Sequence, residues 1–167
     1  MESDTKRIEG KLDRIVDLLE SNAGARELVA RSQEKFWALE GLRERIEDNA
    51  GNVMIVGAVG LPTGETYDWQ QAESVTTALQ LEWSDLSDVL GALGHPIRLL
   101  ILQNIVSGTR STPQLAAIPE LGTTGQLHHH LRLLIAAGWL TSTGRGHYAI
   151  PAPRVVPLLA ILLAANR

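Results

Sequence analysis

The clearest pattern of apolar and polar positions lies between residues 121 and 140. Leu127, Leu131 and Leu134 are spaced four and three apart, which places them on one face of a helix that ends at Gly138. Small or polar residues fall on roughly the opposite face: Gly125, His128, His129 and Arg132. We therefore predict one amphipathic helix over residues 123–137.

The flanking segments predict a helix, a turn, a second helix and a hairpin. Ser111 can cap a short helix over residues 112–118, and a tight connection leads from it to the helix over 123–137. Residues 139–150 form two short strands around a turn that contains Arg145. A helix-turn-helix followed directly by a basic-tipped hairpin is the layout of a winged helix.

The first half of the chain has a different pattern. Residues 5–21 and 25–48 each carry an apolar stripe at helical spacing, and we expect both helices to pack through it. Residues 53–59 and 65–69 are rich in strand-forming residues and flank a Pro-Thr-Gly turn, which predicts a β-hairpin. Residues 72–81 are ambiguous, because their centre favours a strand and their flanks favour a helix.

The pattern is clear again from Ser84 onwards. Ser84 can cap a helix over residues 85–93, and after a break at Gly94-His95-Pro96 a further helix follows over residues 97–106. Residues 155–165 form a last helix that is apolar nearly all round, so it must be buried, most simply against its copy in a dimer.

The predicted fold class is therefore mainly α with short β-hairpins. A winged helix-turn-helix domain is preceded by an N-terminal helical segment and a β-hairpin. We expect three parts: the N-terminal helices over 1–50 as a packing or dimer arm, the hairpin and connector over 51–83, and the winged-helix domain with its C-terminal dimerisation helix over 84–167.

Composition narrows the function. The 167 residues include no cysteine, which excludes disulfides and thiolate metal sites. The N-terminus is acidic rather than apolar, and the longest apolar run has 11 residues against the roughly 20 that a membrane span needs, so we expect a cytoplasmic protein with no membrane partner.

The distribution of charge separates the two halves of the chain. The net charge is −4, but residues 1–83 hold 9 Lys and Arg against 16 Asp and Glu, whereas residues 84–167 hold 6 Arg against 3 acids and all five His. No acidic residue occurs from Gly122 to Gly146. A localised basic region of this kind is the electrostatic footprint expected of a nucleic-acid binder.

Two motifs resemble a known family. Residues 90–102, LGALGHPIRLLIL, are similar to the opening helices of the ArsR-type winged-helix transcriptional regulators, and residues 127–134, LHHHLRLL, followed by AGWL at 137–140, are similar to that family's recognition helix. The resemblance covers about residues 84–165. It implies a DNA-binding regulator whose terminal helices form the interface of a homodimer.

The predicted partner is double-stranded DNA, with helix 123–137 in the major groove and the wing, residues 141–150, on the backbone or minor groove. Gln126 can pair with adenine, Arg132 can hold a phosphate or a guanine, and Arg145 lies at the tip of the wing. His130 flanks the apolar face and is expected to be a hydrogen-bonded structural residue. The residues predicted to contact DNA are Thr123, Thr124, Gly125, Gln126, His128, His129, Arg132, Arg145 and His147.

Other residues bear on small-molecule, metal and catalytic chemistry. Tyr67, Trp69 and Trp83 are candidates for a small-molecule effector pocket, although such aromatic residues more often fill a core. Consecutive helical histidines point about 100° apart and cannot converge on one metal ion, and the family's metal ligands are missing from residues 114–117 and 155–167, so we expect no metal or other cofactor. No catalytic motif is present, which argues against an enzyme. The alternative function is a winged-helix protein-interaction module with weak or no DNA binding, suggested by the acidic first half.

Overall fold

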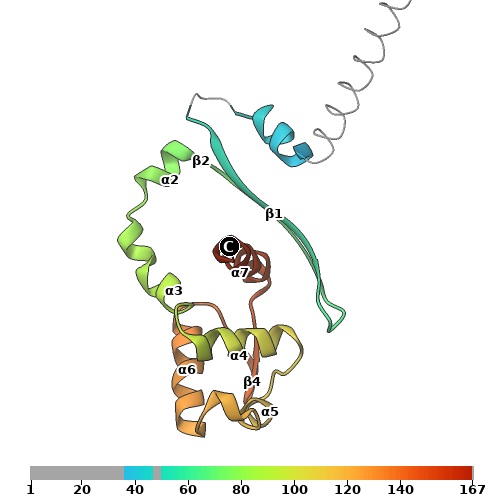
Figure 1. The fold of residues 1–167 in the computed structure, drawn as a ribbon, viewed down its shortest axis with the longest axis vertical. Coiled ribbons are helices and arrows are strands. Elements are labelled where there is room, and N and C mark those ends of the chain that lie inside the picture. Colours follow the sequence, from blue (N-terminus) through green and yellow to red (C-terminus); the bar gives the residue numbers. More distant parts are fainter. Residues whose placement is uncertain (1–35, 47–49, 167) are drawn as a thin grey trace, which may run out of the picture. The chain divides into compact units, whose positions relative to one another are not determined.

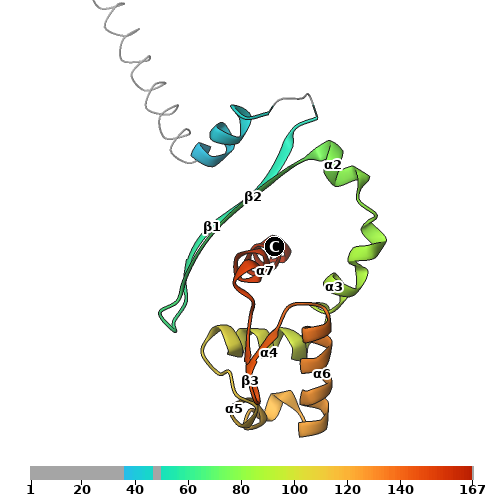
Figure 2. The same ribbon diagram turned by 180° about the vertical axis from the view of Figure 1, so that it is seen from behind.

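The computed structural model describes residues 36–46 and 50–166, in two compact units that divide at residue 51. In the first unit residues 36–43 are helical, inside the helix predicted over 25–48, while the helix predicted over 5–21 lies outside the described residues. The described chain is mainly helical with two antiparallel β-hairpins (Figures 1 and 2). The elements of the second unit are β1 (Asn52–Gly60), β2 (Thr66–Ser74), α2 (Val75–Gln80), the 3-10 turn η1 (Trp83–Leu86), α3 (Ser87–Gly91), α4 (Pro96–Val106), α5 (Thr112–Ala116), the 3-10 turn η2 (Pro119–Leu121), α6 (Thr124–Ala136), β3 (Thr141–Gly144), β4 (His147–Ala149) and α7 (Ala152–Ala165).

The first hairpin is longer than its sequence predicts. β1 and β2 pair antiparallel from Asn52 opposite Ser74 to Gly60 opposite Thr66. The turn is closed by the Gly64 amide, which donates to the Leu61 carbonyl at 2.9 Å, and Gly64 has a φ of 87°, a conformation that favours glycine. The second strand therefore continues beyond residue 69, because β1 supplies a partner at every position as far as Ser74.

The ambiguous segment resolves into a strand followed by a helix. Ser74 ends β2 and caps α2, since its hydroxyl oxygen accepts a hydrogen bond from the Thr77 amide at 3.0 Å. This cap lets the β-branched run from Val75 start a helix despite its preference for strands. The predicted cap at Ser84 is wrong: Ser84 lies inside η1, and α3 begins after Leu86 without a side-chain cap.

The core is built by α4, α5, α6 and the segments that follow them. Its fully buried members come from each of these elements: Ile101, Leu102, Ile105, Leu115, Leu121, Leu127, Leu131, Leu134, Trp139, Leu140, Val155 and Leu158. The indole N–H of Trp139 donates to the Val89 carbonyl at 2.8 Å, and the Arg154 guanidinium lies 4.9 Å from the ring centroid. These contacts attach the turn after α6 to α3 on one side and to α7 on the other.

The last helix is buried over its first half only. Val155, Val156 and Leu158 are buried, and α7 packs against both strands of the β1–β2 hairpin (Figure 1). Gly57 of β1 permits this packing, because a Cβ atom there would lie 2.6 Å from a methyl group of Val156. Towards the C-terminus, Leu162 and Leu163 are 38% and 75% exposed. The hairpin therefore covers part of the apolar surface that the sequence analysis assigned wholly to a second copy.

In the described ranges, no single helix is both long and apolar enough to cross a membrane. One bent pair, Trp83–Gly91 with Pro96–Val106, meets that test of length and composition when its two helices are taken together.

Candidate nucleic-acid interface

The helix predicted to read DNA is α6, and both of its ends are fixed by local hydrogen bonds. At the start, the Thr123 hydroxyl accepts from the Gln126 amide while the Gln126 side chain accepts from the Thr123 amide, a reciprocal capping box. At the end, the amides of Gly138 and Trp139 donate to the carbonyls of Ile135 and Leu134 at 3.0 and 2.9 Å, the pattern of a Schellman motif. The helix thus begins and ends within a residue of the predicted bounds.

The apolar stripe of α6 is buried as predicted. Leu127, Leu131 and Leu134 are 0%, 1% and 0% exposed. At roughly 25 cal/mol per Å², each buried leucine side chain contributes about 1.5–3 kcal/mol and fixes the rotation of the helix about its axis. Nine predicted contact residues are exposed on α6, its N-terminal approach and the second hairpin: Thr123, Thr124, Gly125, Gln126, His128, His129, Arg132, Arg145 and His147. The structure thus places all nine residues at the protein surface.

Gln126, predicted to pair with adenine, has a local role in the cap of α6. Its side-chain oxygen accepts hydrogen bonds from both the amide and the hydroxyl of Thr123, at 2.9 and 3.1 Å. A bidentate contact with adenine needs the same oxygen as an acceptor. Gln126 is therefore a capping residue in this structure, and an adenine contact would compete with the cap.

The second hairpin is tied to the start of α5. β3 and β4 pair antiparallel, and the Thr112 amide donates to the Gly146 carbonyl at 2.8 Å. The Tyr148 amide donates to the Arg110 carbonyl at 2.9 Å, and Ser111 forms an isolated bridge with His147. The loop before α5 thus acts as a second partner for β4, beside β3. Because Arg145 lies in the turn of this hairpin, these bonds fix the backbone that carries Arg145 relative to the start of α5.

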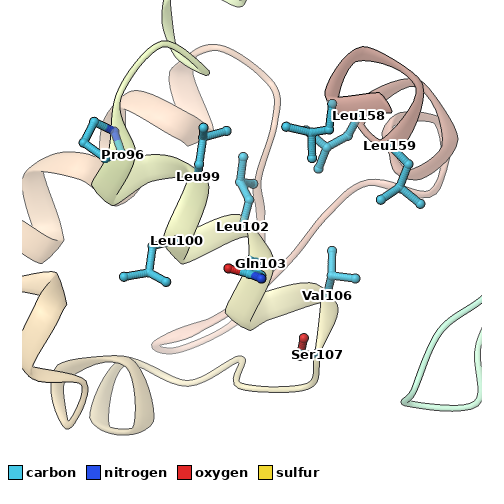
Figure 3. Close-up of a pocket in the computed structure, with 10 residues that line it drawn as sticks. Pro96, Leu99, Leu100, Leu102, Gln103, Val106, Ser107, Leu158 and Leu159 are labelled. Atoms are coloured by element: carbon cyan, nitrogen blue, oxygen red, sulfur yellow. The ribbon is translucent and has the colours of Figure 1, made fainter. Parts of the chain in front are cut away.

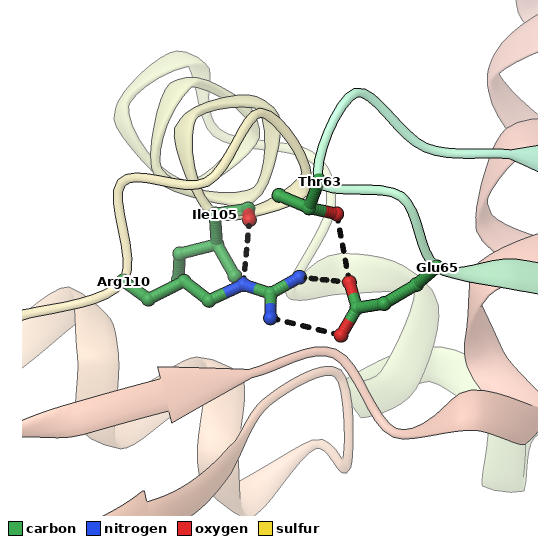
Figure 4. Close-up of polar contacts among 4 residues, drawn as sticks. All are labelled: Thr63, Glu65, Ile105 and Arg110. Carbon is green, nitrogen blue, oxygen red and sulfur yellow. Dashed lines mark hydrogen bonds and ion pairs between the residues drawn. The ribbon is translucent and has the colours of Figure 1, made fainter.

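Arg110 also binds the tip of the first hairpin, a contact that the sequence analysis missed. Its guanidinium donates through two nitrogens to the two carboxylate oxygens of Glu65, one bond measuring 3.0 Å, and its Nε donates to the Ile105 carbonyl at 3.4 Å (Figure 4). The Thr63 hydroxyl donates to the same carboxylate at 2.8 Å. The bonds from Arg110 and Thr63 lower the pKa of Glu65 from 4.5 to about 2. Arg110 therefore links the first hairpin, the end of α4 and the second hairpin.

His130 is half-buried, unlike its two neighbours in the triplet. Its ring lies 4.7 Å from that of His95, whose Nδ1 accepts from the Ile97 amide at 3.2 Å and so caps α4. Within the described part of the chain, the buried Nδ1 of His130 has no hydrogen-bond partner, so the predicted hydrogen bond is not made through this atom. Burial lowers the pKa of His130, and the nearby His95, His129 and Arg98 lower it further.

The three aromatic residues proposed for an effector pocket have different surroundings. Tyr67 is half-buried beside a cavity of about 20 Å³, which has room for about one water molecule. Trp69 lies two residues along the same strand face, and its indole nitrogen is buried without a hydrogen-bond partner among the described residues. Trp83 is 64% exposed and donates its indole N–H to the Ala78 carbonyl at 2.9 Å. The space beside Tyr67 is therefore too small for an organic effector.

A larger open groove lies between α4 and α7. It has a volume of about 710 Å³ and a mostly apolar lining, with Gln103 and Ser107 as its polar residues (Figure 3). None of the three predicted aromatic residues lines it. Its apolar lining residues are Pro96, Leu99, Leu100, Leu102, Val106, Leu158, Leu159 and Leu162.

Among residues 36–46 and 50–166, no three His, Asp or Glu side chains come together in a way that could hold a metal ion. His129 and His130 are adjacent with their ring centroids 5.6 Å apart, in an edge-on arrangement.

No protein-family model and no curated protein matches the chain. Among solved structures, the chain is similar to the crystal structure of M. tuberculosis Rv0081, at 26% sequence identity over 56% of this chain and 90% of that chain, with a TM-score of 0.42.

Proposed function

We propose that this chain is an ArsR-type winged helix-turn-helix regulator that binds a specific double-stranded DNA sequence as a homodimer. In this arrangement α6 enters the major groove, and the β3–β4 hairpin is the wing, which contacts the backbone or the minor groove. Two copies of α6 would lie in successive major grooves about 10 bp apart.

The order and packing of the elements support a winged helix. α5 and α6 are joined by a short turn through η2, α4 packs against α6, and the hairpin follows directly after α6. Each of these short helices has its own cap, and each hairpin strand has a bonded neighbour. Such a scaffold can hold a reading helix in one orientation, which base recognition requires.

The observation that carries the proposal is the outward face of α6. His128, His129 and Arg132 are exposed while the opposite face is locked into the core, and no acidic residue interrupts the sequence from Gly122 to Gly146. A solvated helix of ordinary function usually mixes both signs of charge. A face that offers imidazole and guanidinium groups and no carboxylate suits base edges and phosphates.

Gly125 adds a second feature of this face. A Cβ atom at this position would meet no other atom within 4 Å, so packing inside the chain does not require a glycine. Glycine in a helix costs about 0.5–1 kcal/mol relative to alanine. A residue without a side chain in the first turn of α6 would let the backbone amides approach a phosphate closely.

The proposal is tested by titrating a labelled DNA fragment from the region upstream of the gene with wild-type protein and three variants. Arg132→Ala and Arg145→Ala are each expected to weaken binding by about 1–3 kcal/mol and to reduce the salt dependence of the affinity. Arg43→Ala is the matched control, because Arg43 is an exposed arginine of the first unit.

The control variant should bind as wild type does, and an unrelated fragment of equal length should bind more weakly. If both Arg132→Ala and Arg145→Ala leave the affinity and its salt slope unchanged, α6 and the wing do not contact DNA. Binding of a partner protein in place of DNA would then become the better assignment for the outward face.

A further inference from the structure

The outer edge of β1 is an unpaired strand edge of the second unit. β1 and β2 form a sheet of only two strands, so one side of β1 has no strand beside it within the described part of the chain. Val53 and Val56 are 60% and 46% exposed. A two-stranded sheet is marginal on its own, and an unpaired strand edge readily accepts a further strand.

The register defines which backbone groups are free. The Leu61 amide donates to the Glu65 carbonyl, so Leu61 and every second residue before it turn their N–H and C=O groups towards β2. Met54, Val56 and Ala58 then turn theirs away from β2, towards the open edge. No backbone hydrogen bond from another described element reaches these three residues.

The two edges of the hairpin differ in charge. β1 has the sequence NVMIVGAVG, with no charged residue and no proline, whereas β2 contains Asp68 and Glu73. Natural proteins protect edge strands from pairing with charges, prolines or bulges. β2 has such protection and β1 has none, which marks β1 as the edge built for a partner.

We infer that this edge pairs with β1 of a second copy of the chain, antiparallel and centred on Val56. A twofold axis through Val56 places Val56 opposite its own symmetry mate and pairs every other residue with the one equally far from Val56 on its other side. Like charges at paired positions would repel each other, and β1 carries no charged residue. With Val56 opposite Val56, Met54 faces Ala58 and Asn52 faces Gly60. Every pair is uncharged: Ile55 faces Gly57, and Val53 faces Val59. The sequence of β1 thus suits pairing with itself.

The result is a continuous four-stranded sheet across the dimer. The twofold axis is perpendicular to the sheet, so both copies of α7, which cover one face of the hairpin, lie on the same face. This inference deepens the homodimer of the proposed function and rests on it, because it adds the edge of β1 to the terminal helices as a surface through which the two chains associate.

The test measures the oligomeric state of the full chain by sedimentation velocity over a concentration series, without DNA. Val56→Lys places two ammonium groups opposite each other, and Ala58→Pro removes an amide that would donate across the axis. Both are expected to raise the dimer dissociation constant by roughly tenfold or more. Gln70→Lys is the matched control, because Gln70 pairs with Val56 but lies on the other strand.

The inference is supported if the wild type and the Gln70→Lys control are dimers while Val56→Lys and Ala58→Pro are monomers. A monomeric wild type, dimeric edge variants, or a control that dissociates equally would overturn it. Hydrogen exchange on the unmodified protein covers the case of a variant that does not fold. The outward amides of Met54, Val56 and Ala58 should be protected in a concentration-dependent way, and rapid exchange at high concentration would overturn the inference.

DNA binding separates this inference from the proposed function. A dimer that forms through β1 but binds no DNA would remove the proposed function and leave the interface intact. A protein that binds DNA specifically while Val56→Lys remains dimeric would remove the interface and leave the function intact.

Discussion

Replacing Glu65 with Gln removes the carboxylate that Arg110 and Thr63 hold at the tip of the first hairpin. The folded protein lowers the pKa of Glu65 from 4.5 to about 2. A carboxylate with a lowered pKa stabilises the fold above about pH 4.5 and loses that contribution as the pH falls towards about 2. The neutral amide of Gln cannot show this dependence.

The exposure of the pair limits the size of the effect. At about 1.4 kcal/mol per pKa unit, the full shift would correspond to about 3 kcal/mol of folding free energy. However, the side chains of Arg110 and Glu65 are 30% and 40% exposed, so solvent screens the interaction. Exposed ion pairs contribute up to about 1 kcal/mol. We therefore expect Glu65→Gln to destabilise the protein by about 1 kcal/mol at pH 7.

Urea denaturation of wild type and Glu65→Gln at pH 7 and at pH 3 measures this contribution. The difference in unfolding free energy between the two proteins should shrink at pH 3. Asp68→Asn is the control, since Asp68 is an exposed carboxylate of the same hairpin. Should the difference between wild type and Glu65→Gln be the same at both pH values, the ion pair does not hold the hairpin to the end of α4.

Two glycines near the start of α6 give opposite predictions. Gly122 has a φ of 77°, and a Cβ there would lie 2.5 Å from the Gln126 side-chain oxygen. Gly122→Ala should therefore lower the free energy of unfolding by about 1–3 kcal/mol. An unchanged melting temperature would contradict the strained turn. Gly125→Ala meets no atom within 4 Å and should raise stability by up to about 1 kcal/mol while weakening DNA binding, and a variant that binds DNA more tightly would contradict the close approach of the backbone.

The second half of the chain was predictable because its signals are local. Ser111 and Thr123 each begin a capping box, and Gly138 takes the φ of 73° that ends α6, so these residues define the two helices without reference to distant parts. The spacing of Leu127 and Leu131 correctly separates the buried face from the exposed one.

The contacts that the sequence did not reveal connect distant segments. Glu65 and Arg110 are 45 residues apart, and no periodic pattern relates them. The length of β2 depends on its partner strand, and the helix that starts at Val75 depends on the cap from Ser74, which outweighs the strand preference of the run. The burial of the first half of α7 by the β1–β2 hairpin could not be predicted either, because tertiary packing alone determines where the hairpin lies.

Site-specific photo-cross-linking tests the central claim most directly, since it reports which surface touches DNA. A cross-linking amino acid placed at His129, on the outward face of α6, and at Leu163, on the exposed end of α7, is irradiated with the upstream DNA fragment bound. We predict a cross-link to DNA bases from position 129 and none from position 163. A cross-link from position 163 alone, or equal yields from both, would contradict the assignment of α6 as the reading helix.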